Sequence, residues 1–368
     1  MKIGIDASRA QVKERTGTEN YSQNLILALS KIDSKNSYRL YFRRSDKDFC
    51  DLPKNFEKKF IGLPRLWTQV GLAFEVLKNP PDLLFIPAHT LPIIRRPSLK
   101  TVVTVHDLGA EFLPGYHTFG GREYLLLSTR YAVKNATALI AVSQATKHDL
   151  IEKLGADHAK IFVVYEGVDH HFFKPQEPNE IEGVKAKYKI SGDYFLFVGT
   201  IQPRKNLVRL IEAFAKLGER KNLNFVLAGK KGWLADEIYQ APKKFKVEEK
   251  VRFLDYVVLE DLPALYSGCL AFVLPSLVEG FGLPVLEAMA CGAPVILSTA
   301  SSLTEVGGSA ALYMAPDNTK ELVNHLTKVL DPNLREKLSV KSIDQAQKFS
   351  WEKCAEETLE VFERIHES

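Results

Sequence analysis

Short apolar runs alternate with amphipathic stretches along the whole chain. KIGIDAS (2–8) predicts a buried strand, and ENYSQNLILALSKI (19–32) predicts a helix, because Leu25, Leu29 and Ile32 fall on one helical face. The same pattern predicts strands at 38–43, 82–88, 100–107, 137–143, 160–167, 194–200, 224–232, 251–257, 270–276, 293–299 and 310–316, and helices near 67–78 and 206–219. Strands that recur with helices between them indicate parallel βαβ units.

The stretch FFKPQEPNEIEGVKAKYKISG (172–192) interrupts this alternation with two prolines and many charges. It predicts a connection between domains that carries a short helix. Two domains also suit a chain of 368 residues, because single cores rarely grow beyond about 250–300 residues. The expected fold class is therefore α/β, with two doubly wound parallel-sheet domains in succession. Ligands of such sheets bind at the carboxyl ends of the strands, so two facing domains would place a site in a central cleft.

Composition is that of an ordinary soluble globular protein, and the net charge of +4 is too small to indicate nucleic-acid binding. The charge is uneven: Lys31 to Arg65 holds ten Lys/Arg and five Asp/Glu. Such a run is typical of a solvated face, and a patch facing phosphates or anionic lipid is the alternative.

The cysteines and the apolar runs indicate the cellular compartment of the protein. The four cysteines are scattered singly without metal-ligand spacing, and Asp6 stands where a signal peptide needs an apolar core. No apolar run approaches the roughly 18 residues of a membrane span. We therefore expect a cytoplasmic protein, with peripheral contact at the inner face of the plasma membrane left open.

The loop VGTIQPRKN (198–206) is the first candidate site. A strand ends at Gly199, the loop carries Arg204 and Lys205, and a helix begins near Asn206. Two cations at a helix N-terminus suit a diphosphate. The alternative is that both cations are solvated and that Asn206 caps the helix.

The stretch PSLVEGFGLPVLEAMACG (275–292) places Glu279 in a glycine-bearing turn and Glu287 in the helix that follows. Glycines let the backbone approach a ligand closely, and a carboxylate in the turn can accept hydrogen bonds from sugar hydroxyls. Glu287 can reach back toward the same crevice. The alternatives are a solvent-facing Glu279 and a Glu287 that only favours the helix dipole.

Two features of the N-terminal half also follow strands. RTGTENY (15–21) is a loop that contains Gly17, and TVHDLG (104–109) ends a strand with His106 and Asp107. A lone histidine is more often structural than catalytic, and this reading is stronger for His89 in IPAHT. The chain has no serine-hydrolase elbow, Walker loop or zinc pattern.

The segment EGFGLPVLEAMACGAPVI (279–296) resembles the signature of retaining glycosyltransferases with two Rossmann-like domains, the GT-B architecture, and more narrowly family 4, with its many bacterial mannosyltransferases. Five further segments resemble landmarks of that family: VGTIQPRKNLVRLIEAF, AVSQATKHDL, VYEGVDHHFF, SSLTEVGGSAALYMAP and FSWEKCAEETLEVF. The resemblance covers nearly the whole chain. It implies an acceptor-side domain at 1–172, a nucleotide-sugar-binding domain at 173–348, and a C-terminal helix at 349–368 that crosses back to the first domain.

The resemblance also implies roles for residues. Glu279 would contact hydroxyls of the donor hexose and Glu287 the ribose, while Arg204 and Lys205 would neutralise the diphosphate. His106 would touch the donor sugar near the reacting centre. The other donor-binding residues would be Gly17 by the diphosphate and acceptor, Thr200 after the strand glycine, Gly280, Phe281, Gly282 and Leu283 around the hexose, and Tyr256 and Val257 against the base.

Thr200 departs from the family's pattern, because many members carry an arginine directly after the strand glycine. Arg204 beside Lys205 would supply the missing charge. Thr304 likewise replaces the usual proline of its segment.

The implied reaction moves a hexose from a nucleotide diphosphate sugar to a hydroxyl of a glycan or lipid-linked acceptor, with the anomeric configuration retained. Mannose from GDP-mannose is the first expectation and a UDP-hexose the alternative. No Asp-x-Asp pair stands at a strand end, so no metal and no cofactor are expected. A nucleotide-sugar epimerase of the same fold and a catalytically silent nucleotide-sugar binder remain as rival readings.

Overall fold

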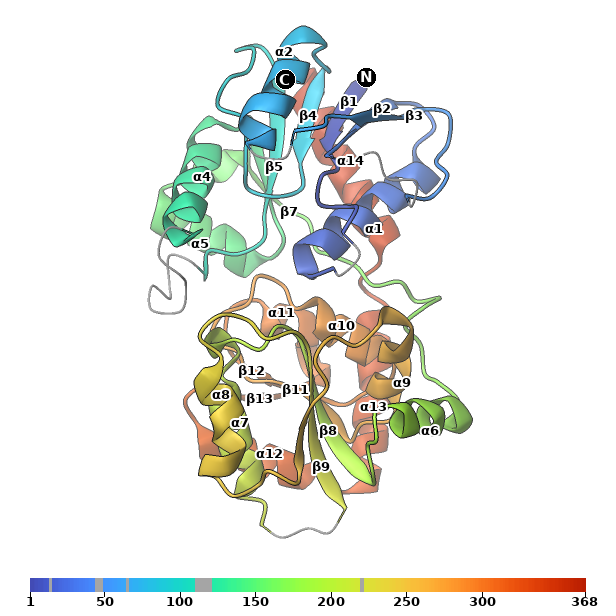
Figure 1. The fold of residues 1–368 in the computed structure, drawn as a ribbon. Helices are drawn as coiled ribbons and strands as arrows, with labels where there is room; N and C mark the ends of the chain where they lie inside the picture. Colours follow the sequence, from blue (N-terminus) through green and yellow to red (C-terminus); the bar gives the residue numbers. More distant parts are fainter. Residues whose placement is uncertain (13–14, 44–48, 64–65, 110–120, 219–221) are drawn as a thin grey trace. The chain divides into compact units, whose positions relative to one another are not determined.

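The computed structural model describes residues 1–12, 15–43, 49–63, 66–109, 121–218 and 222–368. The described chain divides into two compact units, one from Met1 to Gly167 together with Trp351–Ser368, and one from Val168 to Ser350 (Figure 1). Each unit is built on a parallel sheet with helices on both faces. The predicted fold class, two doubly wound Rossmann-like domains, is therefore confirmed. The domain boundaries drawn from the sequence, at 172/173 and 348/349, stay predictions.

The first unit holds a seven-stranded sheet in the order β3-β2-β1-β4-β5-β6-β7, and every pair in it is parallel. Its strands are β1 (Lys2–Asp6), β2 (Ser37–Phe42), β3 (Phe56–Phe60), β4 (Leu83–Ile86), β5 (Lys100–Val105), β6 (Ala138–Ala141) and β7 (Ile161–Val163). Its helices include α1 (Gly17–Ile32), α2 (Ala73–Lys78), α4 (Gly121–Asn135), α5 (Gln144–Leu154) and α14 (Trp351–Glu367).

Local sequence explains these elements. The strands β4 and β6 are uninterrupted apolar runs that are buried along their whole length, as expected for a parallel sheet covered on both faces. Helix α1 starts with a capping box, in which the Thr16 amide donates to the Glu19 carboxylate at 3.1 Å. Its apolar face packs against α14, so the last helix of the chain belongs to the first unit.

Two local features differ from the sequence prediction. Strand β3 was not predicted, because its sequence FEKKF has charged residues in the middle and lacks an apolar run. The expected helix at 67–78 is present, but its first part, Trp67–Leu72 (η1), is wound as a π-helix before α2 begins.

The second unit holds a six-stranded parallel sheet in the order β10-β9-β8-β11-β12-β13. Its strands are β8 (Asp193–Val198), β9 (Leu223–Ala228), β10 (Val251–Phe253), β11 (Ala271–Leu274), β12 (Val295–Ser298) and β13 (Leu312–Met314). Its helices are α6 (Pro178–Lys187), α7 (Leu207–Ala215), α8 (Asp236–Lys244), α9 (Leu262–Ser267), α10 (Leu283–Ala290), α11 (Leu303–Gly307), α12 (Thr319–Lys328) and α13 (Pro332–Ala346). Helices α7, α8 and α12 pack together, and α9, α10 and α13 form a second group.

The strand order locates the place where each sheet can bind a ligand. It reverses direction between β1 and β4 in the first sheet and between β8 and β11 in the second. Such switch points open a crevice at the carboxyl ends of the two diverging strands. In the second unit the loops at this crevice are 199–206, after β8, and 275–282, after β11.

Candidate functional site

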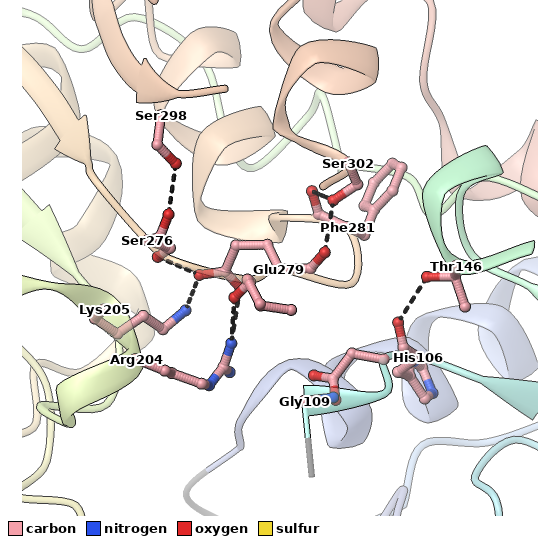
Figure 2. Close-up of polar contacts among 12 residues, drawn as sticks. His106, Gly109, Thr146, Arg204, Lys205, Ser276, Glu279, Phe281, Ser298 and Ser302 are labelled. Carbon is pink, nitrogen blue, oxygen red and sulfur yellow. Dashed lines mark hydrogen bonds and ion pairs between the residues drawn. The ribbon is translucent and has the colours of Figure 1, made fainter. Parts of the chain in front are cut away.

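Glu279 lies in the turn between β11 and α10 and is only 7% exposed. Its Oε1 accepts hydrogen bonds from Lys205 Nζ and from Ser276 Oγ, each at 2.5 Å, and its Oε2 accepts from Arg204 at 3.3 Å (Figure 2). Both cations come from the loop after β8. The structure therefore brings three of the predicted site residues together at the switch point of the second sheet.

The groups around Glu279 determine whether its carboxyl is ionised. Burial by itself would raise the pKa of the Glu279 carboxyl, but the charges of Lys205 and Arg204 and the hydrogen bonds from Lys205 and Ser276 hold that pKa below its ordinary 4.5. The carboxylate is thus ionised at neutral pH. Lys205 and Arg204 are also charged, so the cluster places two cations beside one carboxylate.

Backbone contacts fix the two loops to each other. Arg204 also donates to the carbonyl of Val278 at 2.9 Å, and the Leu277 amide donates to the carbonyl of Arg204 at 2.9 Å. Asn206 is in the left-handed conformation, with φ 59°, and its side chain donates to the carbonyls of Pro275 and Pro316. Asn206 therefore ties loops together and does not cap α7 with its side chain, as one reading of the sequence supposed.

The glycine-bearing turn is held in place as well. Gly282 has φ 110°, and a Cβ atom there would lie 3.0 Å from a methyl group of Leu303, so glycine is needed. Ser302 Oγ lies within hydrogen-bond distance of the carbonyls of Glu279, at 3.1 Å, and Phe281, at 3.0 Å (Figure 2). These contacts hold the backbone on both sides of Gly280.

Glu287 is the fifth residue of α10 and is 8% exposed. Its Oε2 accepts a hydrogen bond from the Tyr266 hydroxyl at 2.9 Å, and among the described residues its Oε1 has no hydrogen-bond partner. Burial raises the pKa of Glu287 to about 7, although the Tyr266 bond opposes this. Glu287 is therefore partly protonated at neutral pH, whereas Glu279 is fully ionised.

The remaining donor-side residues occupy neighbouring loops of the second unit. Thr200 is half-buried after β8, and Leu283 is buried at the start of α10. Val257 is buried, while Tyr256 is 37% exposed and has Lys230 Nζ over its ring at 4.9 Å from the centroid. A cation thus covers the aromatic side chain that the sequence assigned to the base.

In the first unit, Gly17 is the first residue of α1, and a Cβ atom there would meet no atom within 4 Å. His106 follows β5 and is buried. Its Nδ1 lies 3.0 Å from Glu166 Oε1, and its Nε2 lies 2.8 Å from the carbonyl oxygen of Pro87. Both partners are acceptors, so both ring nitrogens must carry a proton and the side chain is an imidazolium.

The pKa of His106 agrees with this geometry. Burial would lower it, but the hydrogen bond and the charge of Glu166 outweigh burial and raise it. His89 is the opposite case: burial and the nearby charge of His106 lower its pKa to about 4, and its buried Nδ1 has no partner among the described residues. The contact of His106 with the donor sugar stays a prediction, and the structure gives both its ring nitrogens other partners.

Sequence reasoning did not single out four residues that support these groups: Ser276, Ser302, Tyr266 and Glu166. Ser302 and Glu166 lie inside segments that resemble the family, and Ser276 follows β11 with only Pro275 between them. Tyr266 lies on the short helix α9, and its position gives no local signal of a partner on α10.

Three further features of the described residues concern metal ligands, membrane spans and cysteines. Within the described part of the chain, no three His, Cys, Asp or Glu residues lie together in a way that could hold a metal ion. No described helix combines the length and the apolar character needed to cross a membrane. The four cysteines are unpaired, with Cys50 exposed and the other three buried.

Comparison with known proteins gives matches over both units. The family described as "Glycosyltransferase Family 4" matches residues 16–172, and "Glycosyl transferases group 1" matches residues 181–349. O-antigen chain mannosyltransferase B of Escherichia coli is 33% identical, over 72% of this chain and 71% of its own length. O-antigen chain mannosyltransferase RfbU of Salmonella typhimurium is 31% identical, over 84% of this chain and 85% of its own length.

Solved structures resemble both units of the fold. Sucrose-phosphate synthase of Thermosynechococcus elongatus matches with a TM-score of 0.79 and 18% identity, over 99% of each chain. Alr3699/HepE of Anabaena, in complex with UDP and glucose, matches with a TM-score of 0.74 and 18% identity, over 98% of this chain and 99% of that one. The structural likeness establishes the architecture, the sequence matches establish the family, and the chain therefore belongs to the family 4, group 1 glycosyltransferases of GT-B architecture.

Proposed function

We propose that this glycosyltransferase moves a mannosyl group from GDP-mannose to a hydroxyl of a growing surface polysaccharide or lipid-linked glycan, with retention of the anomeric configuration. The observation that carries the proposal is the cluster of buried Glu279 and Lys205 with half-buried Arg204 at the switch point of the second sheet. The O-antigen mannosyltransferases among its relatives favour mannose as the sugar. A UDP-hexose is the second candidate donor, because HepE, with the same architecture, was solved in complex with UDP and glucose.

The two cations would act on the leaving group. As the glycosidic bond breaks, negative charge develops on the diphosphate, and donors that are already oriented stabilise it without reorganisation. Glu279 holds Lys205 and Arg204 in position, and the two cations would contact the diphosphate from there. Protein cations would thus do the work that a metal ion does in other transferases, and no cofactor is needed.

Glu279 is poorly suited to be a covalent nucleophile. Both of its oxygens accept hydrogen bonds, from Lys205 and Ser276 on one side and Arg204 on the other, and its pKa is lowered. Both effects reduce the reactivity of its lone pairs. We propose instead that it positions a hexose hydroxyl and that the leaving phosphate helps to deprotonate the acceptor on the same face of the sugar.

Three further placements belong to the same proposal. Oε1 of Glu287 would accept a hydrogen bond from a ribose hydroxyl, while Tyr266 holds the other oxygen. Tyr256 and Val257 would lie against the base. For the base to stack on the Tyr256 ring, Lys230 must either leave that ring or stay on the ring face opposite the base. Gly280 and Gly282 would let the turn backbone approach the hexose.

A thermal-unfolding panel tests the donor class. It compares GDP-mannose, UDP-glucose, UDP-N-acetylglucosamine and the bare nucleotides. A ligand at one hundred times its dissociation constant stabilises the fold by about 2.7 kcal/mol, which gives a readily measured shift. We expect the guanine nucleotides to raise the unfolding temperature. A response to uracil nucleotides alone would replace GDP-mannose by a UDP-hexose, and no response to any nucleotide would contradict the proposed site.

Turnover distinguishes an enzyme from a binder. Donor and a mannose-containing oligosaccharide are mixed in excess EDTA, and release of nucleoside diphosphate is followed together with the proton NMR spectrum of the product. We expect release and a product with the anomeric configuration of the donor. Loss of turnover in EDTA with recovery in manganese would contradict metal independence, and a glycosylated Glu279 detected by mass spectrometry would contradict its assigned role.

A further inference from the structure

The exposed apolar side chains of the first unit are concentrated in one region. The described residues of this unit carry nine exposed large hydrophobic side chains, and seven of them lie on three segments. Leu66, directly before η1, Val70 on η1 and Phe74 on α2 are 50–70% exposed. The others are Ile93 and Ile94, at least 60% exposed, and Tyr124 and Leu127 on α4, at least 57% exposed. Most apolar surface residues are scattered singly, so such a concentration indicates an interaction surface.

The segment of η1 and α2 is apolar on two sides. Leu66, Val70 and Phe74 recur every fourth residue and face solvent, while Trp67 and Val76 are buried in the unit. A helical segment that is apolar all round is ordinarily covered on both sides. Its outer stripe is uncovered by any described part of the chain.

Hydrogen bonds join the three segments into one framework. The Gln69 side chain, on η1, donates to the carbonyl of Leu91 at 3.1 Å and accepts from the amide of Ile93 at 2.9 Å. On the other side, the Tyr131 hydroxyl of α4 donates to the carbonyl of Ile93, and Arg95 donates to that hydroxyl at 2.9 Å. Arg96 of the same loop donates to the carbonyl of Leu77 on α2. The loop at 91–96 therefore joins η1 and α2 to α4; α2 and α4 are labelled in Figure 1. We call residues 66–78, 91–96 and 123–134 the α2–α4 surface.

The exposed charges of the α2–α4 surface are all positive. Its exposed charged side chains are Lys78, Arg96, Arg130 and Lys134. Its two acidic residues, Glu75 and Glu123, are only half exposed, and Glu75 already lies near Arg39 of β2. Apolar side chains beside exclusively basic exposed charges match the boundary between headgroups and acyl chains of an anionic membrane.

The basic run at Lys31–Arg65, which the sequence raised as a lipid-facing candidate, lacks this combination. Arg39 is paired with Glu57 at 2.8 Å, and Lys58 Nζ donates to the carbonyls of Phe49 and Cys50. The described residues of this run carry one exposed large hydrophobic side chain, Phe60. Positive charge alone gives weak and salt-sensitive attraction, so this run is the poorer candidate.

We propose that the α2–α4 surface docks the protein onto an anionic lipid bilayer, with Phe74, Ile94 and Leu127 entering the interface and the basic side chains contacting lipid phosphates. This proposal concerns the first unit only and does not depend on which nucleotide sugar the second unit binds. A bilayer is favoured over a protein partner because the surface combines exposed apolar side chains on three separate segments with exposed cationic side chains, and a bilayer needs no matching shape.

Vesicle flotation without any nucleotide tests the proposal. The full chain is mixed with vesicles of phosphatidylcholine alone or of phosphatidylcholine with phosphatidylglycerol, at low and high salt. We expect flotation only with the anionic vesicles and less of it at high salt. The double variants Phe74→Ser/Ile94→Ser and Lys78→Ala/Lys134→Ala should each reduce the bound fraction, with a partition coefficient lower by about tenfold or more.

Matched controls separate this surface from general effects. Val340→Ser removes an equally exposed apolar side chain from α13, and Lys35→Ala/Lys54→Ala removes two exposed charges from the Lys31–Arg65 run. Both controls should float like the wild type, and thermal unfolding should show that every variant is folded. The proposal is overturned if the wild type does not float with anionic vesicles, if the controls lose binding as strongly, or if light scattering shows a dimer that Phe74→Ser/Ile94→Ser dissolves.

Discussion

Substitution of Glu287 by glutamine should stabilise the protein in alkali while weakening nucleotide binding. Glutamine keeps the shape of the side chain, and its carbonyl can still accept the hydrogen bond from Tyr266. It removes the carboxyl that burial makes costly to ionise. The substitution therefore isolates the cost of a buried charge at this position.

The magnitude follows from the pKa of Glu287, which is about 7 in the folded protein against an ordinary value of 4.5. The folded state holds the proton more tightly than the unfolded state, so the carboxyl contributes full stability below about pH 4.5 and loses it as pH rises through about 7. A difference of this size corresponds to about 3 kcal/mol. Since glutamine does not titrate, the variant's stability relative to wild type should rise by about 2–3 kcal/mol between about pH 5 and about pH 8.5.

The same substitution should weaken nucleotide binding. The ionised carboxylate of Glu287 is the stronger acceptor for ribose hydroxyls, so wild-type affinity for the nucleotide should increase as pH rises through about 7. The glutamine variant should bind more weakly by roughly tenfold at alkaline pH and should lose this pH dependence.

Urea unfolding across this pH range and calorimetric titration with the nucleotide selected by the thermal panel measure the two effects. A stability difference that does not change with pH would refute the raised pKa. Unchanged nucleotide affinity would refute the ribose contact.

Three further outcomes are expected. Tyr266→Phe removes a donor to the buried carboxylate, so the pKa of Glu287 should rise above about 7, and the pH at which nucleotide binding tightens should move up with it. Glu166→Gln should lower the pKa of His106, because burial then dominates; an NMR titration of the imidazole would show this, and an unchanged value would contradict the imidazolium assignment. Ser302→Ala should cost about 1 kcal/mol in denaturant unfolding and raise the KM for the donor, and an unaltered KM would mean that the turn does not need this tether.

Much of the fold could be predicted because parallel strands buried on both faces are uninterrupted apolar runs. LLFI in β4 and AFVL in β11 are examples. Strand β3 could not be predicted in this way, because it lies at the edge of its sheet and its middle residues, Glu57, Lys58 and Lys59, give no apolar signal. The π-helical start of the segment at 67–78 depends on backbone geometry that apolar periodicity does not report.

The candidate site was predicted in its parts but not in its contacts. The two cations and the glutamate were assigned to separate loops and separate groups of the donor, whereas Lys205 and Glu279, 74 residues apart in sequence, form an ion pair. The pairing of His106 with Glu166 spans 60 residues. Such contacts arise from the order of strands in the sheet and not from local spacing, so a single sequence does not reveal them.

The most direct test of the central claim measures how much of the nucleotide affinity depends on the diphosphate. Calorimetric titrations compare the diphosphate with the bare nucleoside for the wild type, for Lys205→Met and for the control Lys216→Met. Lys216 is an exposed lysine directly after α7 that pairs with Glu212. We predict that the diphosphate binds more tightly than the nucleoside to the wild type and the control. In Lys205→Met this advantage should fall by roughly ten- to a hundredfold. An advantage of equal size in all three proteins would contradict the assignment of this cluster to the donor diphosphate.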